Sequence, residues 1–260
     1  MPKGTYEILI IDGSTNNLVS NFVANYLRKY NFVRYIKKSG CNLPEALNIG
    51  IKNMRGRFFK QLDDDDVLVS GAIKKYLEYA NKHKNYLIFY SDAYIIDEHN
   101  NFVGDEEERN YNKQKLMTTI WSRPIGVPSS YMINKEAFKI VGMFNPKSLV
   151  VEDWEWRLRA IIGKELLMYH IPIRLIKYRR YKDQKSYREM VYAPYEMYKI
   201  RKQFLSAYAH NIDKDILKDL KISRAYAAAS LMKRYIEFKL GLKENRYYRE
   251  FIRRIELLFS

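Results

Sequence analysis

Short apolar runs alternate along the chain with longer segments in which apolar residues recur every three or four positions. The short runs predict buried strands, and the longer segments predict amphipathic helices. Strands are expected at residues 6–11, 32–36, 57–62 and 86–90, and residues 94–96 are expected to pair with 102–103. Helices are expected near residues 18–27, 43–51 and 71–81, and the pattern is helical from about residue 187 onward.

This alternation predicts an α/β fold with a mixed, mostly parallel sheet that carries helices on both faces. A helical C-terminal extension follows it. Ligands of such sheets gather at the carboxyl ends of the strands. Asp12 directly follows the first predicted strand, and four aspartates at residues 63–66 follow the third. Two separate elements therefore point to one crevice.

The four consecutive aspartates at residues 63–66 are the most informative polar feature. Adjacent carboxylates repel one another, and a divalent cation such as Mg²⁺ or Mn²⁺ would neutralise them with hard oxygen ligands. The alternative is a solvated acidic loop before the helix that follows, because acidic residues favour a helix N-terminus. Taken alone, the tetrad supports the two interpretations equally.

Composition limits the class of protein. A hydrophobic content of 47% in 260 residues is ample for a core. A single cysteine, Cys41, excludes an internal disulfide and fits a reducing compartment. The chain has neither a signal-peptide pattern nor an apolar run of the roughly 18–20 residues that a membrane span needs. We therefore expect a cytoplasmic protein.

The net charge of +16 is concentrated in the last part of the chain. Residues 164–260 carry 23 Lys and Arg against 11 Asp and Glu, whereas residues 1–163 carry 23 against 19. Basic helices at the C-terminus suggest contact with an anionic membrane surface. The interpretation that we favour is a helical region that packs an apolar face on the sheet. Binding of nucleic acid is not favoured.

Six motifs in chain order resemble those of the family 2 glycosyltransferases, which have the GT-A (Rossmann-like) fold and use nucleotide sugars. They include the strand that ends in Asp-Gly-Ser-Thr at residues 12–15 and the Leu-Asp-Asp-Asp-Asp stretch at 62–66, which matches the family's Asp-x-Asp metal motif. The others are residues 48–58, the turn 141–144, the pair Glu152-Asp153 and the stretch 178–180. The resemblance implies a GT-A domain over residues 1–186 and a basic helical region over 187–260.

By this resemblance the chain is a metal-dependent, hexosyltransferase-like enzyme. Asp65 and Asp63 would hold Mg²⁺ or Mn²⁺. The sites for the nucleotide sugar, most simply a UDP-sugar, would be Asp12, Asp63, Asp64, Arg179 and Arg180. Since an acceptor hydroxyl needs a general base, Asp153 is expected to supply one in a single inverting displacement. Glu152 and Trp154 would contact the acceptor, which is expected to be a polysaccharide, a glycan or a lipid-linked sugar.

One departure from the family bears on activity. The family opens with an apolar strand and a helix before the strand that here begins near Tyr6, and this sequence has neither. A missing central strand would expose strand edges on both sides of the gap and would make a homodimer plausible. The alternative function is therefore a catalytically inactive GT-A-like scaffold or binding protein.

Overall fold

The computed structural model describes residues 6–148, 150–181 and 192–221. The strands are β1 (Ile8–Asp12), β2 (Val33–Lys37), β3 (Phe58–Lys60), β4 (Val67–Leu68), β5 (Ile88–Ile96), β6 (Phe102–Glu106), β7 (Tyr131–Asn134) and β8 (Met168–Arg179). The α-helices are α1 (Leu18–Lys29), α2 (Leu43–Asn53), α3 (Ala72–Lys82), α4 (Lys113–Ser122), α5 (Lys135–Val141), α6 (Glu152–Leu158) and α8 (Ala193–Tyr208). The short turns are η1 (Pro128–Ser130), η2 (Arg159–Gly163) and η3 (Ala209–Asn211).

Six strands form the main sheet, in the order β3-β7-β5-β8-β4, and β6 pairs with β5. The mixed sheet of the predicted fold is confirmed, but the expectation of mostly parallel pairing is wrong for the described strands. Only β5–β8 and β1–β2 pair in parallel, whereas the other four pairings are antiparallel. The short strands β4 and β7 run against their neighbours. The expected pairing of residues 94–96 with 102–103 is present as β5–β6.

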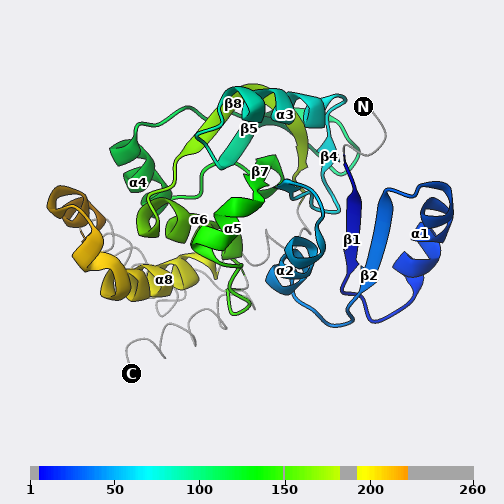
Figure 1. Ribbon diagram of the computed structural model, residues 1–260, viewed down its shortest axis with the longest axis horizontal. Coiled ribbons are helices and arrows are strands. Elements are labelled where there is room, and N and C mark those ends of the chain that lie inside the picture. Colours follow the sequence, from blue (N-terminus) through cyan, green and yellow to red (C-terminus); the bar gives the residue numbers. More distant parts are fainter. Residues whose placement is uncertain (1–5, 149, 182–191, 222–260) are drawn as a thin grey trace, which may run out of the picture.

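Strands β1 and β2 form a separate two-stranded parallel sheet. Figure 1 shows this pair with α1 at one end of the molecule, and α2 lies between it and the larger sheet. The apolar residues of β1 are only partly buried, and Ile8 is 44% exposed. The prediction of a buried first strand is therefore wrong in its burial, because β1 has a described strand on one side only.

Helix α2 is well specified by its first turn. The Asn42 side chain accepts a hydrogen bond from Glu45 N at 3.0 Å, and Glu45 Oε2 accepts one from Asn42 N at 2.9 Å. This reciprocal pair is a capping box, and Pro44 pre-sets the backbone of the first turn. At the other end of the helix, Gly50 is buried. A methyl group at Gly50 would contact Ile11 of β1 and Phe59 of β3, each at 3.9 Å.

The main sheet separates two apolar clusters. Successive residues of a strand point to opposite faces, so the neighbours Phe58 and Phe59 report one face each. Phe59 packs in the larger cluster, which contains Ile51 of α2 and residues of α4, α5 and α6. Phe58 packs in the smaller cluster, which contains Ala72, Tyr76 and Ala80 of α3. The predicted arrangement of helices on both faces is thus observed.

Helix α8 joins the larger cluster through Phe204 and Leu205. Beside them, the buried Arg201 donates to Trp121 O at 2.9 and 2.6 Å and to Ser122 O at 3.0 Å. Its guanidinium also lies 5.2 Å from the ring centroid of Trp154. Burial lowers the pKa of Arg201 to about 10, so it is charged at neutral pH. In the described part of the chain no carboxylate forms an ion pair with it.

Replacing Arg201 by Ala is expected to lower the free energy of unfolding by about 2–4 kcal/mol, because the carbonyls of Trp121 and Ser122 lose a donor and a cavity opens. Chemical denaturation would measure the change. Arg201→Met keeps most of the volume and is the control that isolates the loss of hydrogen bonds. An unchanged unfolding midpoint in R201A would mean that α8 is not part of the cooperative unit.

The part of the C-terminal region that is described, residues 192–221, therefore packs in the same core as the sheet domain. The arginine-rich segment at 246–254 lies outside the described residues, so membrane docking through it stays a prediction. None of the described helices is both long enough and apolar enough to cross a membrane.

Candidate active site

A cavity of about 1950 Å³ opens along β1, β3 and the start of α6. Its acidic end is lined by residues 63–66, Glu152, Asp153 and Arg180. The tetrad follows β3, the acidic pair begins α6, and Arg180 follows β8. Segments far apart in sequence therefore meet at one place, as the family resemblance implies, but Asp12 is not among the lining residues.

The tetrad is a turn that is tied to its surroundings by its own backbone. Asp66 N donates to Asp63 O at 3.1 Å, and Asp63 N donates to Ser129 Oγ at 2.9 Å. Asp66 Oδ1 accepts from the backbone N–H of Arg179 at 2.9 Å, which joins the turn to β8. Within this turn Asp64 is exposed, whereas Asp63 and Asp65 are partly buried. The carboxylates are thus held at fixed positions rather than on a free loop.

The charges of this turn are poorly compensated within the described residues. Burial raises the pKa of Asp63 to about 7 and that of Asp66 to about 6, and neighbouring carboxylates add to both shifts. Burial also lowers the pKa of the nearby Lys60 to about 7. Asp66 Oδ2 is buried and has no hydrogen-bond partner in the described part of the structure. A positive charge placed here would stabilise the ionised carboxylates.

Hard oxygen donors of this kind fit Mg²⁺ or Mn²⁺. No group of three or more His, Cys, Asp or Glu side chains in the described chain is arranged to hold a metal ion. That finding agrees with the way Mg²⁺ is usually held, by one or two carboxylates together with waters and substrate phosphates. Asp65 and Asp63 are therefore suited to hold an ion that a ligand's phosphates help to coordinate.

The two carboxylates at the start of α6 have different surroundings among the described residues. Asp153 forms an ion pair with the buried guanidinium of Arg157, one helical turn later, and accepts from Trp154 N at 2.6 Å. Its charge contributes to the raised pKa of Asp63, which confirms that the two lie close together. Glu152 is only 5% exposed. Burial, followed by the charge of Asp153, raises the pKa of Glu152.

Asp12 has a different environment from the one expected. Its Oδ2 accepts from Tyr35 Oη at 2.6 Å and from Lys37 Nζ at 3.2 Å, while Oδ1 accepts from Ser14 N at 2.8 Å. These hydrogen bonds, that of Tyr35 first, hold the pKa of Asp12 well below its usual range. Asp12 is 4% exposed and does not line the cavity. The structure assigns it to shaping the turn after β1, and the predicted nucleotide contact is not supported.

Two further predicted contacts need correction. Trp154 is 0% exposed and donates its indole N–H to Ile120 O at 2.6 Å, so the prediction that it contacts a sugar is wrong. Arg179 donates to Asp65 O and Asp97 O at 2.8 and 2.7 Å and to Asn100 Oδ1 at 2.8 Å. Its guanidinium therefore hydrogen-bonds to the turns at Asp65 and at residues 97–100, and Arg179 does not line the cavity. Arg180 does line the cavity and is 55% exposed, with one ion pair to Glu106 at 3.0 Å.

Lys60 is the polar group at the site that the sequence did not indicate, and Asp66 and Arg157 have contacts that the sequence does not show. Lys60 donates to Gln61 O at 3.0 Å and to Ser129 O, and its ammonium lies 5.0 Å from the ring centroid of Tyr76. Asp66 carries the unpartnered oxygen, and Arg157 anchors Asp153. The alternation of β3 could have indicated that Lys60 points inward. Residues two apart in a strand lie on the same face, so Lys60 shares the face of the packed Phe58.

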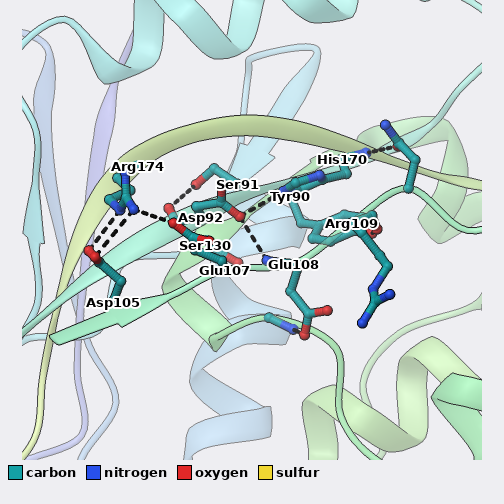
Figure 2. A network of polar contacts seen from close by, with 12 residues as sticks. Tyr90, Ser91, Asp92, Asp105, Glu107, Glu108, Arg109, Ser130, His170 and Arg174 are labelled. Atoms are coloured by element: carbon teal, nitrogen blue, oxygen red, sulfur yellow. Dashed lines mark hydrogen bonds and ion pairs between the residues drawn. The ribbon is translucent and has the colours of Figure 1, made fainter.

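A second polar network surrounds Asp92 in the middle of β5. Figure 2 shows Asp92 between His170 and the segment that follows β6. Asp92 Oδ1 lies 2.7 Å from His170 Nε2 and accepts from Glu108 N at 2.9 Å. Arg174 of β8 pairs with Asp105 at 2.7 Å and also with Glu107. These contacts hold the two long parallel strands and the following loop in register.

Glu108 closes this network at the loop before α4. Its carboxylate, 3% exposed, accepts two hydrogen bonds from Arg123 at 2.7 and 3.0 Å and one from Gly126 N at 3.0 Å. Burial alone would raise the pKa of Glu108. The hydrogen bonds outweigh burial and lower that pKa below its ordinary value of 4.5.

Glu108→Gln is expected to destabilise the fold by about 1–3 kcal/mol near neutral pH. Because the folded state lowers the pKa of Glu108, its contribution is fully present above pH 4.5 and is lost as the pH falls through the folded value. The difference in unfolding free energy between wild type and E108Q should therefore shrink as a denaturation series moves from neutral to acidic pH. A difference that grew on acidification would contradict this assignment. Glu98→Gln, in an exposed turn, is the control.

The chain is similar in sequence to known proteins of one family. The model of the family described as glycosyl transferase family 2 matches residues 2–142. An uncharacterized glycosyltransferase of Methanocaldococcus jannaschii is 24% identical over 193 residues, which cover 69% of this chain and 65% of that protein. The chain thus spans slightly less than two thirds of this relative's length.

Solved structures give the same picture for the fold. The crystal structure of S. aureus TarS residues 1–349 matches with a TM-score of 0.64 at 14% identity, and covers 94% of this chain and 68% of that one. The same TarS fragment in complex with UDP matches with a TM-score of 0.54 at 13% identity, over 77% and 57% of the two chains. This likeness confirms the predicted GT-A fold.

Proposed function

Because the chain belongs to the family 2 glycosyltransferases, we propose that it transfers a sugar from a nucleotide-diphosphate donor to an acceptor hydroxyl. One observation carries the proposal. The aspartate turn at residues 63–66, the Glu152-Asp153 pair and Arg180 converge on the acidic end of a single cavity. The donor phosphates, a cation and the acceptor would meet there.

A UDP-sugar is the donor that we propose. A structural neighbour, the S. aureus TarS fragment, has been crystallised in complex with UDP. On this chain Asp63 and Asp64 would bind the nucleotide sugar. Arg180 is more than half exposed, so its guanidinium is free to exchange the ion pair with Glu106 for a diphosphate. Arg and phosphate pair well because the planar guanidinium matches two phosphate oxygens.

Asp65 and Asp63 would hold Mg²⁺ or Mn²⁺. The cation would supply electrostatic stabilisation of the charge that develops on the leaving diphosphate. The raised pKa values of Asp63 and Asp66 support this assignment, since burial and the neighbouring carboxylates disfavour their ionised forms and a bound cation would favour them. The turn's backbone hydrogen bonds would keep both ligands in place when the donor binds.

Asp153 would act as the general base. It lines the cavity at the start of α6, and the ion pair with Arg157 fixes which oxygen faces the protein. The other oxygen, Oδ1, accepts from Trp154 N at 2.6 Å, and its remaining lone pair would accept the proton of the acceptor hydroxyl while that hydroxyl attacks the anomeric carbon. A single displacement of this kind inverts the configuration at that carbon. Glu152 would contact the acceptor through its protonated form, which burial favours.

The acceptor would be a glycan, a polysaccharide or a lipid-linked sugar at the inner face of a membrane. The basic excess of residues 164–260, with 23 Lys and Arg against 11 Asp and Glu, supports attachment to an anionic surface. A cytoplasmic enzyme with such peripheral contact fits the single free cysteine.

Calorimetric titration with UDP and GDP, in Mn²⁺ and in EDTA, tests the proposal. We expect UDP to bind in Mn²⁺ and to bind much more weakly in EDTA. Transfer from a panel of UDP-sugars would then identify the sugar. If neither nucleotide binds under any condition, the catalytically inactive scaffold is the better account of this chain.

A further inference from the structure

Two strand edges without partners face each other along the apolar part of the cavity. The lining runs continuously through residues 6–11 on one side and 56–62 on the other. Among the described strands, β1 is hydrogen-bonded only to β2, and β3 only to β7. Each strand therefore presents one row of backbone N–H and C=O groups with no partner strand. We call the space between these two edges the strand slot.

The two edges run in the same direction and are held in place by side chains. Glu7 Oε1 accepts from the backbone N–H of Arg55 and of Gly56, at 2.5 and 3.3 Å, so the start of β1 lies beside the start of β3. Further along, Ile11 and Phe59 both lie against Gly50 of α2. One inserted strand could therefore run parallel to both edges at once.

The slot is closed on both faces by helices with apolar side chains. On one face α2 contributes Leu43, Ala46 and Leu47, and Met54 follows directly after the helix. On the opposite face α3 contributes Ile73 and Leu77. The two helices lie on opposite sides of the sheet because Phe59 packs with the α2 cluster and Phe58 with the α3 cluster. Parallel strands covered on both faces in this way consist of consecutive apolar residues.

We propose that the strand slot binds an extended apolar peptide segment, which pairs with β1 and β3 and joins the two sheets into one. The unpaired backbone edges require a ligand with its own row of N–H and C=O groups. The apolar walls require Val- or Ile-like side chains on both faces. A sugar or nucleotide meets neither requirement, and its polar groups suit the acidic end of the cavity. Ile8, 44% exposed, would be covered.

The inference does not depend on the proposed function, because it rests on strand edges and helix faces rather than on the carboxylates. It is tested with a synthetic peptide of about eight Val and Ile residues, the length of a long strand, flanked by lysines for solubility. A second peptide carries N-methyl groups at alternate residues, which removes hydrogen bonds but keeps the side chains and the charge.

Hydrogen exchange of the full chain, followed by mass spectrometry, gives the readout. In the free protein, edge amides of β1 and β3 should exchange fast. Adding the peptide should slow them at least about 10-fold, and the N-methylated peptide should have no effect. Gly50→Phe should abolish protection by filling the slot, whereas Gly50→Ala, which has room at 3.9 Å from both neighbours, should preserve it.

Three results would overturn the proposal. The edges could already be protected in the free protein, which would mean that the slot is closed. Both peptides could protect equally or not at all, which would mean that no strand pairs there. Protection that appears only as protein concentration rises, together with a dimer in light scattering, would assign the slot to a second copy instead.

Discussion

Asp153→Asn is expected to lower kcat for sugar transfer by about 10²- to 10⁴-fold, the range that a positioned general base contributes. Asparagine has nearly the same shape as aspartate but cannot take a proton from the acceptor hydroxyl. Affinity for UDP should change little, since Asp153 is proposed to act on the acceptor. Initial rates with a UDP-sugar, measured beside UDP calorimetry on the same preparation, separate the two effects.

The structural role of Asp153 has to be separated from its chemical one. Its carboxylate pairs with the buried Arg157 and accepts from Trp154 N, so its loss could also destabilise α6. The two donors use different carboxylate oxygens, so asparagine keeps only one of these hydrogen bonds, and the Tm of D153N reports the loss. Asp219→Asn, at an exposed position, is the matched control for the substitution. Full turnover by D153N, or loss of UDP binding along with turnover, would contradict the assignment.

Asp65→Asn is expected to weaken UDP binding in Mn²⁺ by at least about 10- to 100-fold. Mutating a residue that only hydrogen-bonds to a metal ligand already lowers metal affinity by about that factor, and Asp65 is proposed to be a ligand itself. An amide oxygen carries no charge, so the cation would be held less tightly and would attract the diphosphate less. Calorimetry of UDP with the variant and the wild type measures the change.

Measuring both proteins in EDTA as well shows whether the metal and Asp65 act through the same interaction. Removing the metal should reduce the wild type to the affinity of D65N and should leave D65N nearly unchanged, because both changes remove one interaction. Asp219→Asn, which alters an exposed carboxylate outside the cavity lining, should behave like the wild type. If wild type binds UDP equally well in EDTA, the metal assignment is wrong, although the nucleotide site would stand.

The positions of most elements could be predicted from the sequence, but the way the strands pair could not. Apolar periodicity located α2 and α3, and the turn before Phe102 located the β5–β6 pair. An apolar run does not encode the direction of its neighbour, so the antiparallel direction of β4 and β7 was not predicted. Pairing depends on contacts far apart in sequence, such as Phe59 with Ile133.

The candidate site shows the same division. Residues 63–66 and Asp153 line one cavity, as the family resemblance implied, whereas Asp12, placed there by the rule for strand ends, does not. Orientation of single side chains was less predictable. Trp154 and Asp153 are adjacent in sequence, yet one is wholly buried and the other lines the cavity, since α6 turns about 100° per residue. The inward position of Lys60 was not predicted, because the sequence analysis weighed β3 as an apolar run and not by the two faces of the strand.

The hydrogen bonds that Glu7 accepts from the backbone N–H groups of Arg55 and Gly56 have a consequence for how the molecule unfolds. No backbone-to-backbone hydrogen bond among the described residues links the β1–β2 pair to the six-stranded sheet, so few contacts make the two parts cooperate. We therefore expect the segment from Ile8 to Lys37 to open more readily than the larger sheet. Protonating Glu7, whose carboxylate faces those two amides, would release that segment first.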